Sequence, residues 1–254
     1  MKKLLVGLSI LALVSACTNS DDTARASFSL TDAPSLKGYQ ALYVDIQGID
    51  YKVDSGEFVA LPMSPVEVNL MNLTNGEDTL LGNVDLKEGE RVTQVRLLLG
   101  DNNTLVLADG SEVNIKTPSG QTSGIKINIQ SVASVSSGYK VLIDFDAEKS
   151  VVAKGNGTYS LKPVIRGYIV ANTSKLTGFI IPSKEPFKVM AVKGTDTIMT
   201  ISDTLLGNFF MLHGLTTGSY DVQFLDSTGV VRKEFLRDIY GGTNVDLDTV
   251  RIDQ

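Results

Sequence analysis

The sequence predicts an all-β protein, with two β-sandwich domains in tandem behind a signal peptide and a short tether. Val, Ile and Thr number 26, 16 and 21 among 254 residues, and these β-branched side chains favour strands. Short alternations of apolar and polar residues, separated by turn residues, recur about every ten residues, which is typical of β-sandwiches. No stretch keeps a 3.6-residue period over three turns, so we expect no long amphipathic helix.

Composition excludes several functional classes. The chain carries 23 Lys and Arg against 29 Asp and Glu, a formal net charge of -6, without a basic run. This argues against nucleic acid as a partner, because phosphates require clustered cations. A single Cys excludes a disulfide framework, and a single His leaves too few ligands for a zinc or copper site. We therefore expect no cofactor.

Residues 1–16 are predicted to be a lipoprotein signal peptide. Lysines follow the initiator Met, and residues 4–14 form an apolar run that is too short to span a bilayer. The run ends in a segment that resembles the bacterial lipobox, Val14-Ser15-Ala16-Cys17. In a lipobox the Cys carries a diglyceride and a fatty acid such as palmitate, and several acyl chains anchor a protein stably. The predicted location is the outer membrane, with membrane lipid as a partner through the anchor at Cys17.

Residues 17–24 contain the lipidated Cys and a polar tether without a strand pattern. Asp21 and Asp22 behind the Cys resemble the export signal with which Bacteroidota place lipoproteins on the cell surface. The alternative is a plain solvated linker. The cell surface and the periplasmic face of the outer membrane are both compatible with this segment.

The first predicted β-sandwich covers residues 25–171. Its first strand alternates Phe28 and Leu30 with polar residues and ends before Pro34, which lacks the N–H that a ladder needs. A longer strand follows over residues 39–53. Alternation of this kind predicts strands with one face towards a core.

Turn residues place the hairpins of this domain. A turn at 54–56 follows the long strand, and Asp109-Gly110 predicts a two-residue hairpin turn in which both residues take positive φ. Gly155-Asn156-Gly157 predicts another hairpin, between residues 151–153 and one strand over residues 158–170. Residues 75–86 carry the weakest strand pattern, and a helical turn is the alternative there.

The second predicted β-sandwich covers residues 176–254, after a polar break at 172–175. Its residues suffice for a small seven-stranded sandwich. Residues 207–222 predict strand, tight turn and strand, and a turn at 226–229 leads into the next strand.

Several motifs follow one another along the first domain: Leu30-Thr31-Asp32-Ala33-Pro34, Tyr43-Val44-Asp45-Ile46, Thr117-Pro118-Ser119-Gly120 with Ser123-Gly124-Ile125-Lys126, Asp144-Phe145-Asp146-Ala147-Glu148-Lys149-Ser150-Val151, and Leu161-Lys162-Pro163-Val164-Ile165-Arg166. Through these motifs, which occur in the family's order, the domain resembles the bacterial family called domain of unknown function 4382. The resemblance implies an envelope or surface module without assigned chemistry.

The second domain looks like the carboxypeptidase-regulatory, transthyretin-like sandwich. The resemblance depends on Gly207-x-Phe209 and on Leu215-x-x-Gly218-x-Tyr220, in which the Tyr ring is buried in such sandwiches. It implies a further envelope module and leaves the ligand unknown, because a shared fold does not supply a function.

Four carboxylates within the matched motifs are candidate metal ligands: Asp32, Asp45, Asp144 and Asp146. Ca²⁺ takes roughly six to eight oxygen ligands, and alternate strand residues point to one face, as Asp144 and Asp146 would. The favoured alternative is turn capping and ion pairing with Lys126, Lys149 or Arg166, because the chain has no Asp-x-Asp-x-Asp-Gly loop.

Catalysis is not expected. His213 shares a predicted strand face with Phe209 and Met211, where a packed or rim His is the favoured interpretation. No Gly-x-Ser-x-Gly segment supplies a nucleophile, and lipid occupies the Cys. Paired carboxylates for glycoside cleavage remain an alternative, because the distance between two carboxylates depends on the fold.

The predicted function is a non-catalytic binding, adhesion or scaffold module that presents strands and loops to another protein of the cell envelope. The alternative is a carbohydrate-binding lipoprotein accessory to glycan capture. Sugars stack on aromatic rings. The chain has no Trp, so the stacking ring would be that of Tyr168, Tyr220 or Tyr240.

Overall fold

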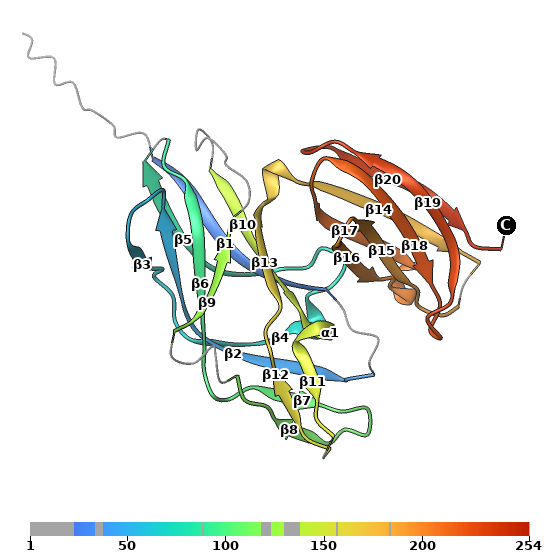
Figure 1. Cartoon of the computed structure of the whole chain (residues 1–254), viewed down its shortest axis with the longest axis horizontal. Coiled ribbons are helices and arrows are strands. Elements are labelled where there is room, and N and C mark those ends of the chain that lie inside the picture. Colours follow the sequence, from blue (N-terminus) through green and yellow to red (C-terminus); the bar gives the residue numbers. More distant parts are fainter. Residues whose placement is uncertain are drawn as a thin grey trace, which may run out of the picture.

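The structure is a computed structural model that describes residues 23–33, 38–87, 89–117, 123–129, 138–155, 157–182 and 184–253. The predicted signal peptide, the lipobox with Cys17, and the tether up to residue 22 lie outside the described residues, as do Pro34 and Asn156. The all-β prediction is confirmed, because the described chain folds into several sheets of two β-sandwiches. The sandwiches lie beside each other along the long axis of the molecule (Figure 1).

The first sandwich contains one sheet whose central pair is parallel. Its order is β13-β10-β1-β5, and β1 runs parallel to β10 and antiparallel to β5. The strands of this sheet are β1 (Thr23–Ala33), β5 (Thr79–Lys87), β10 (Tyr139–Asp146) and β13 (Ile165–Ile169). Strand β1 therefore includes the last two residues of the predicted tether, of which Ala24 is buried.

The second sheet of this sandwich forms around one long strand. Strand β2 pairs with β6 and β7 along one edge and with β3 and β4 along the other. The strands are β2 (Ala41–Val53), β3 (Phe58–Ala60), β4 (Val66–Asn69), β6 (Val92–Leu99), β7 (Thr104–Val106), β8 (Glu112–Asn114) and β9 (Ile125–Asn128). A hairpin of β11 (Val151–Ala153) and β12 (Tyr159–Leu161) lies beside these sheets.

The core of the first sandwich follows from the alternation in the sequence. Phe28 and Leu30 of β1 are fully buried, and they pack with Phe145 of β10 and with Leu42 and Ile46 of β2. Each such side chain contributes about 1.5–3 kcal/mol by leaving water.

The second sandwich has its own core. Its sheets have the orders β17-β14-β20 and β16-β15-β18-β19. The strands are β14 (Ser174–Ile181), β15 (Lys188–Lys193), β16 (Asp196–Ile201), β17 (Phe209–Leu215), β18 (Gly218–Leu225), β19 (Val231–Ile239) and β20 (Asn244–Arg251). Phe210 and Phe224 meet edge to face across this core, with ring centroids 5.5 Å apart.

In the part of the chain that the structure describes, helical structure is confined to short turns. The helix α1 (Ala147–Ser150) follows β10, and 3₁₀ turns lie at Leu70–Asn72, Val170–Asn172 and Thr204–Leu206. The helical turn that was the alternative for residues 75–86 is therefore wrong for Thr79–Lys87, which forms β5 because it pairs with β1 and buries Leu81 and Leu86. No helix of the described ranges is long and apolar enough to cross a membrane.

Two details of the predicted hairpins need correction. At Asp109-Gly110 the hairpin forms, but only Gly110 takes a positive φ, and its N–H donates to the carbonyl of Leu107. Since the N–H of Leu107 donates to the carbonyl of Ser111, the hairpin loop has three residues, 108–110, rather than two. The single strand predicted after the second hairpin is divided into β12 and β13, because Pro163 lies between them and cannot donate to a ladder.

Candidate functional site at the junction of the sandwiches

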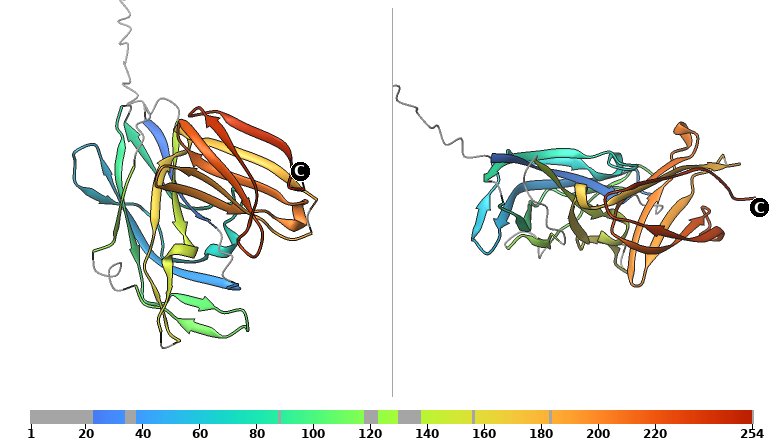
Figure 2. Two further views of the ribbon diagram at one scale, coloured as in Figure 1. Left: turned by 45° about the vertical axis from the view of Figure 1, so that its right-hand side comes forward. Right: turned by 90° about the horizontal axis from the view of Figure 1, so that it is seen from above.

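The junction between the sandwiches brings together most of the candidate residues. A loop of the first sandwich enters the second, where Asn75 Oδ1 accepts hydrogen bonds from Thr200 Oγ1 (2.9 Å) and the N–H of Met211 (3.3 Å). Lys188 Nζ lies 2.8 Å from both carboxylate oxygens of Glu148 on α1. These contacts join the first sandwich to β15, β16 and β17, where the sandwiches meet in both views of Figure 2.

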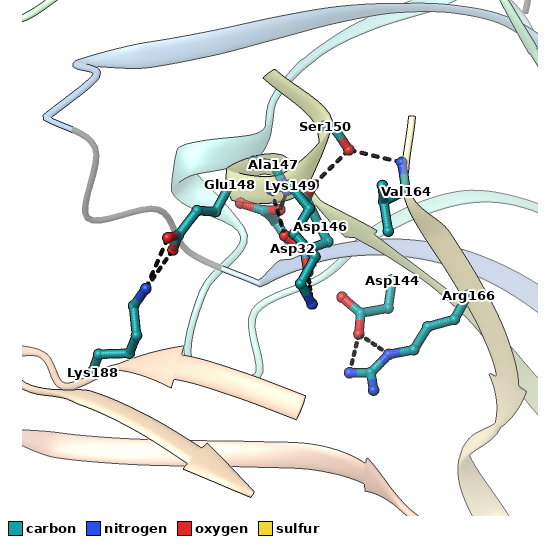
Figure 3. A network of polar contacts seen from close by, with 10 residues as sticks. All are labelled: Asp32, Asp144, Asp146, Ala147, Glu148, Lys149, Ser150, Val164, Arg166 and Lys188. Carbon is teal, nitrogen blue, oxygen red and sulfur yellow. Dashed lines mark hydrogen bonds and ion pairs between the residues drawn. The ribbon is translucent and has the colours of Figure 1, made fainter. Parts of the chain in front are cut away.

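The polar network around α1 uses two of the predicted metal ligands as caps (Figure 3). Asp32 Oδ1 accepts from the N–H of Ala147 at 2.9 Å, although the two residues are 115 positions apart. Asp146 Oδ1 accepts from the N–H of Lys149 at 2.9 Å and caps the helix at its N-terminus. Ser150 Oγ then accepts from the N–H of Val164 at 2.8 Å. Both carboxylates thus stabilise a turn of the chain.

Asp144 forms an ion pair inside the junction. Arg166 Nε donates to Asp144 Oδ2 at 2.6 Å, and only 4% of the Asp144 side chain is exposed. Burial lowers the pKa of Arg166, but the charges of Asp144, Tyr168 and Asp146 and the hydrogen bond to Asp144 together outweigh it, so the pKa lies above its ordinary value. The guanidinium is therefore charged, and it lies against the nearly buried carboxyl group of Asp144.

Asp45 lies away from these carboxylates, on β2 in the other sheet. It accepts from Gln47 Nε2 at 2.5 Å and from the N–H of Asn102 at 3.3 Å. Within the described ranges, no three His, Cys, Asp or Glu side chains are arranged to hold a metal ion. The predicted ligands have structural partners, and calcium binding stays a prediction.

Tyr168 and His213 meet across the junction. Tyr168 lies on β13 and His213 on β17, and the phenol hydroxyl hydrogen-bonds to His213 Nδ1. Burial raises the pKa of Tyr168 well above its ordinary value and lowers that of His213, so both are neutral near pH 7. The phenol hydroxyl has no other acceptor among the described residues, and we therefore assign it as the donor to Nδ1, with the ring proton on Nε2. The single His is thus a junction residue.

Stability should fall as the pH drops below about 6.5, because the unfolded chain then binds a proton that the buried His213 resists. The slope from this one group is at most about 1.4 kcal/mol per pH unit, and it ends at the lowered pKa of the folded state. Urea unfolding at pH 7.5, 6.5 and 5.5 should show a shallower decline for His213→Gln. The same pH dependence in both proteins would contradict this assignment.

The three tyrosines proposed for sugar stacking differ in exposure. Tyr168 and Tyr220 are 6% and 2% exposed, whereas Tyr240 is 66% exposed. The burial predicted for Tyr220 is confirmed, and its hydroxyl bonds to the backbone of Thr216 at 3.1 Å. Only Tyr240 of the three presents its ring to solvent.

Two clefts flank the contact between Tyr168 and Gly214. One cleft has a volume of about 250 Å³ and is lined by Lys140, Tyr168, Lys175, His213 and Asn244 among others. The other has a volume of about 380 Å³ and is lined by Lys126, Asn128, Arg166, Asp196 and Thr216 among others. Sequence reasoning missed Lys175 and Asn244. The only signal for Lys175 in the sequence was its position as the last residue of the polar break, directly before the apolar run that starts at Leu176.

Comparison with known proteins places the first sandwich in a family. A family model described as a domain of unknown function (DUF4382) matches residues 23–163, which confirms the resemblance stated for this segment. The resemblance of residues 176–254 to carboxypeptidase-regulatory domains stays a prediction. No curated protein matches the chain.

Solved structures similar to the chain include a major pilin subunit and a fimbrial protein. The Bacillus anthracis TIE protein is 10% identical, with 90% of this chain and 34% of that chain covered and a TM-score of 0.25. BcpA, the major pilin subunit of Bacillus cereus, is 9% identical over 91% of this chain and 70% of that chain, with a TM-score of 0.23. A fimbrial protein from Bacteroides ovatus is 10% identical over 92% and 51%, with a TM-score of 0.22. The chain spans about a third of the length of the first, and similarity this low carries no argument about function.

Proposed function

We propose that this chain, which belongs to the family described as a domain of unknown function (DUF4382), is a non-catalytic binding or scaffold module anchored by lipid at the outer membrane. The observation that carries the proposal is that buried titratable groups are bound to structural partners. Asp32 caps α1, Asp144 pairs with Arg166, and His213 bonds to Tyr168. Turnover of a glycoside or an ester by the purified protein at about 1 s⁻¹ or faster would contradict this proposal.

The anchor fits the position of the first strand. Strand β1 begins at Thr23, six residues after Cys17, so the tether reaches at most about 20 Å. The first sandwich would therefore stay close to the membrane, with its binding partner, a protein or a glycan, at the cell surface or on the periplasmic face. We favour the surface because Asp21 and Asp22 match the acidic export signal.

Cys17→Ser should abolish the lipid anchor. Cells fed a clickable palmitate analogue should label the parent protein and Ser15→Ala, which keeps a small residue in the lipobox, but not Cys17→Ser. The Ser variant should also leave the outer-membrane fraction, because no acyl chain holds it there. An acyl label that persists on Cys17→Ser would contradict the anchor at this residue.

The second candidate function is glycan capture. Polar side chains line both clefts beside the Tyr168 contact, and Tyr240 presents an exposed ring. The chain has no Trp, so sugar recognition here would depend mainly on hydrogen bonds and charge.

A further inference from the structure

Three hydrogen-bond donors form a row across one face of the second sandwich. Lys175 on β14 is directly opposite Asn244 on β20. On the other side of β14, His213 of β17 lies beside Lys175. The neighbouring Leu176 and Leu212 are buried in the core, so the three polar side chains lie on the outer face of the sheet. This row forms one wall of the 250 Å³ cleft.

The hydrogen bond to Tyr168 occupies Nδ1 of His213. With the phenol assigned as the donor to Nδ1, the ring proton is on Nε2, which has no hydrogen bond within the described part of the chain. The wall therefore offers the ammonium of Lys175, the imidazole N–H of His213 and the amide of Asn244. All three are donors, and two of them are uncharged.

The opposite wall belongs to the first sandwich and carries no net charge. Lys140 Nζ lies 2.8 and 2.6 Å from the two carboxylate oxygens of Asp78, which leaves lone pairs on that carboxylate for further donors. Among the described residues no acidic side chain forms an ion pair with Lys175. The cleft therefore has one uncompensated positive charge in a chain whose net charge is -6.

We propose that this cleft binds an acidic sugar residue, with its carboxylate on the row of Lys175, His213 and Asn244 and its hydroxyls on Asp78. The inference deepens glycan capture and rests on that second proposed function. A carboxylate matches donors beside an unpaired cation, and the volume corresponds to about eight waters, enough for one sugar ring. An amino acid fits less well, because its ammonium would meet two lysines and no unpaired carboxylate.

Because the chain has a single His, the imidazole resonance of His213 reports on this site alone. We would label the imidazole with ¹³C in the detergent-solubilised protein with its N-terminus intact, and titrate it at constant pH 7.5 with glucuronate and galacturonate. The His213 resonance should shift saturably with at least one of these acids and not with glucose or galactose. Lys175→Met, which keeps the side-chain stem, should weaken this binding roughly tenfold or more. Lys126→Met, in the other cleft, should bind as the parent protein does.

The outcomes separate the site from the function on which it rests. Equal shifts with neutral and acidic sugars, or unchanged binding by Lys175→Met, would overturn the role of the cation. If acetate or glycine bound with the same midpoint concentration as the acidic sugars, the cleft would recognise a carboxylate alone. The assignment of a sugar as the ligand would then be wrong. Sugar binding on a glycan array without any shift of His213 would refute this site and leave glycan capture intact. Absence of binding to every glycan would refute both.

Discussion

Gly214→Ala is expected to destabilise the protein by about 2–4 kcal/mol. Gly214 has φ +79°, a conformation that side chains with a Cβ rarely adopt. An added Cβ would also lie 2.6 and 2.7 Å from ring atoms of Tyr168. That ring is buried in the junction and hydrogen-bonded to His213, so moving it away from an added Cβ would break this hydrogen bond.

A substitution at a second glycine separates the cost of the backbone conformation from the cost of the contact with Tyr168. Gly194, in the turn between β15 and β16, has φ +62° and nothing within 4 Å of an added Cβ. Gly194→Ala should therefore lose only about 1 kcal/mol, the cost of the backbone conformation. Urea unfolding of both variants measures the difference. Equal losses would mean that the contact between Tyr168 and Gly214 contributes nothing to the junction.

Arg166→Met should cost about 3–5 kcal/mol, because it leaves the buried carboxyl group of Asp144 without its cation. The loss should shrink in the double variant Asp144→Leu with Arg166→Met, since both charges are then removed and apolar side chains replace them. Denaturant unfolding of the single and double variants gives the two free energies of unfolding.

The matched control is an exposed ion pair of the same kind. Arg25 Nε lies 3.2 Å from Asp85 Oδ1, and the two side chains are 68% and 56% exposed. Arg25→Met should therefore change the free energy of unfolding by no more than about 1 kcal/mol. A similar loss for Arg25→Met and Arg166→Met would show that burial of Asp144 is not the reason for the large effect.

The all-β fold and its local hairpins were predictable because they depend on neighbouring residues. Alternation placed Phe28 and Leu30 in the core, and turn residues located the hairpin at Gly110. The parallel pairs β1 with β10 and β14 with β20 were not predictable, because their partners are far apart in the sequence and no turn connects them. The helix α1 was missed because it has only four residues, too few to show a helical period, and because Asp32, one of its two caps, comes from a distant strand.

The candidate site was predictable only in part. The sequence indicated turn capping and ion pairing with Lys126, Lys149 or Arg166 for the four aspartates without assigning partners, and the structure pairs Asp144 with Arg166 and Asp146 with Lys149. It also indicated a packed or rim position for His213. The contact of His213 with Tyr168 and the row beside Lys175 depend on how one sandwich packs against the other. A local pattern holds no information about that packing.

Protease shaving of intact cells, followed by blotting for this protein, tests the proposed surface location most directly. With the proposed lipid on Cys17, the six residues up to β1 would hold the first sandwich within about 20 Å of the membrane, so both sandwiches would lie on the same side as the lipid. We predict loss of the band while a periplasmic marker survives. Protection of the band until the cells are lysed would contradict the surface location and would make Asp21 and Asp22 a plain linker.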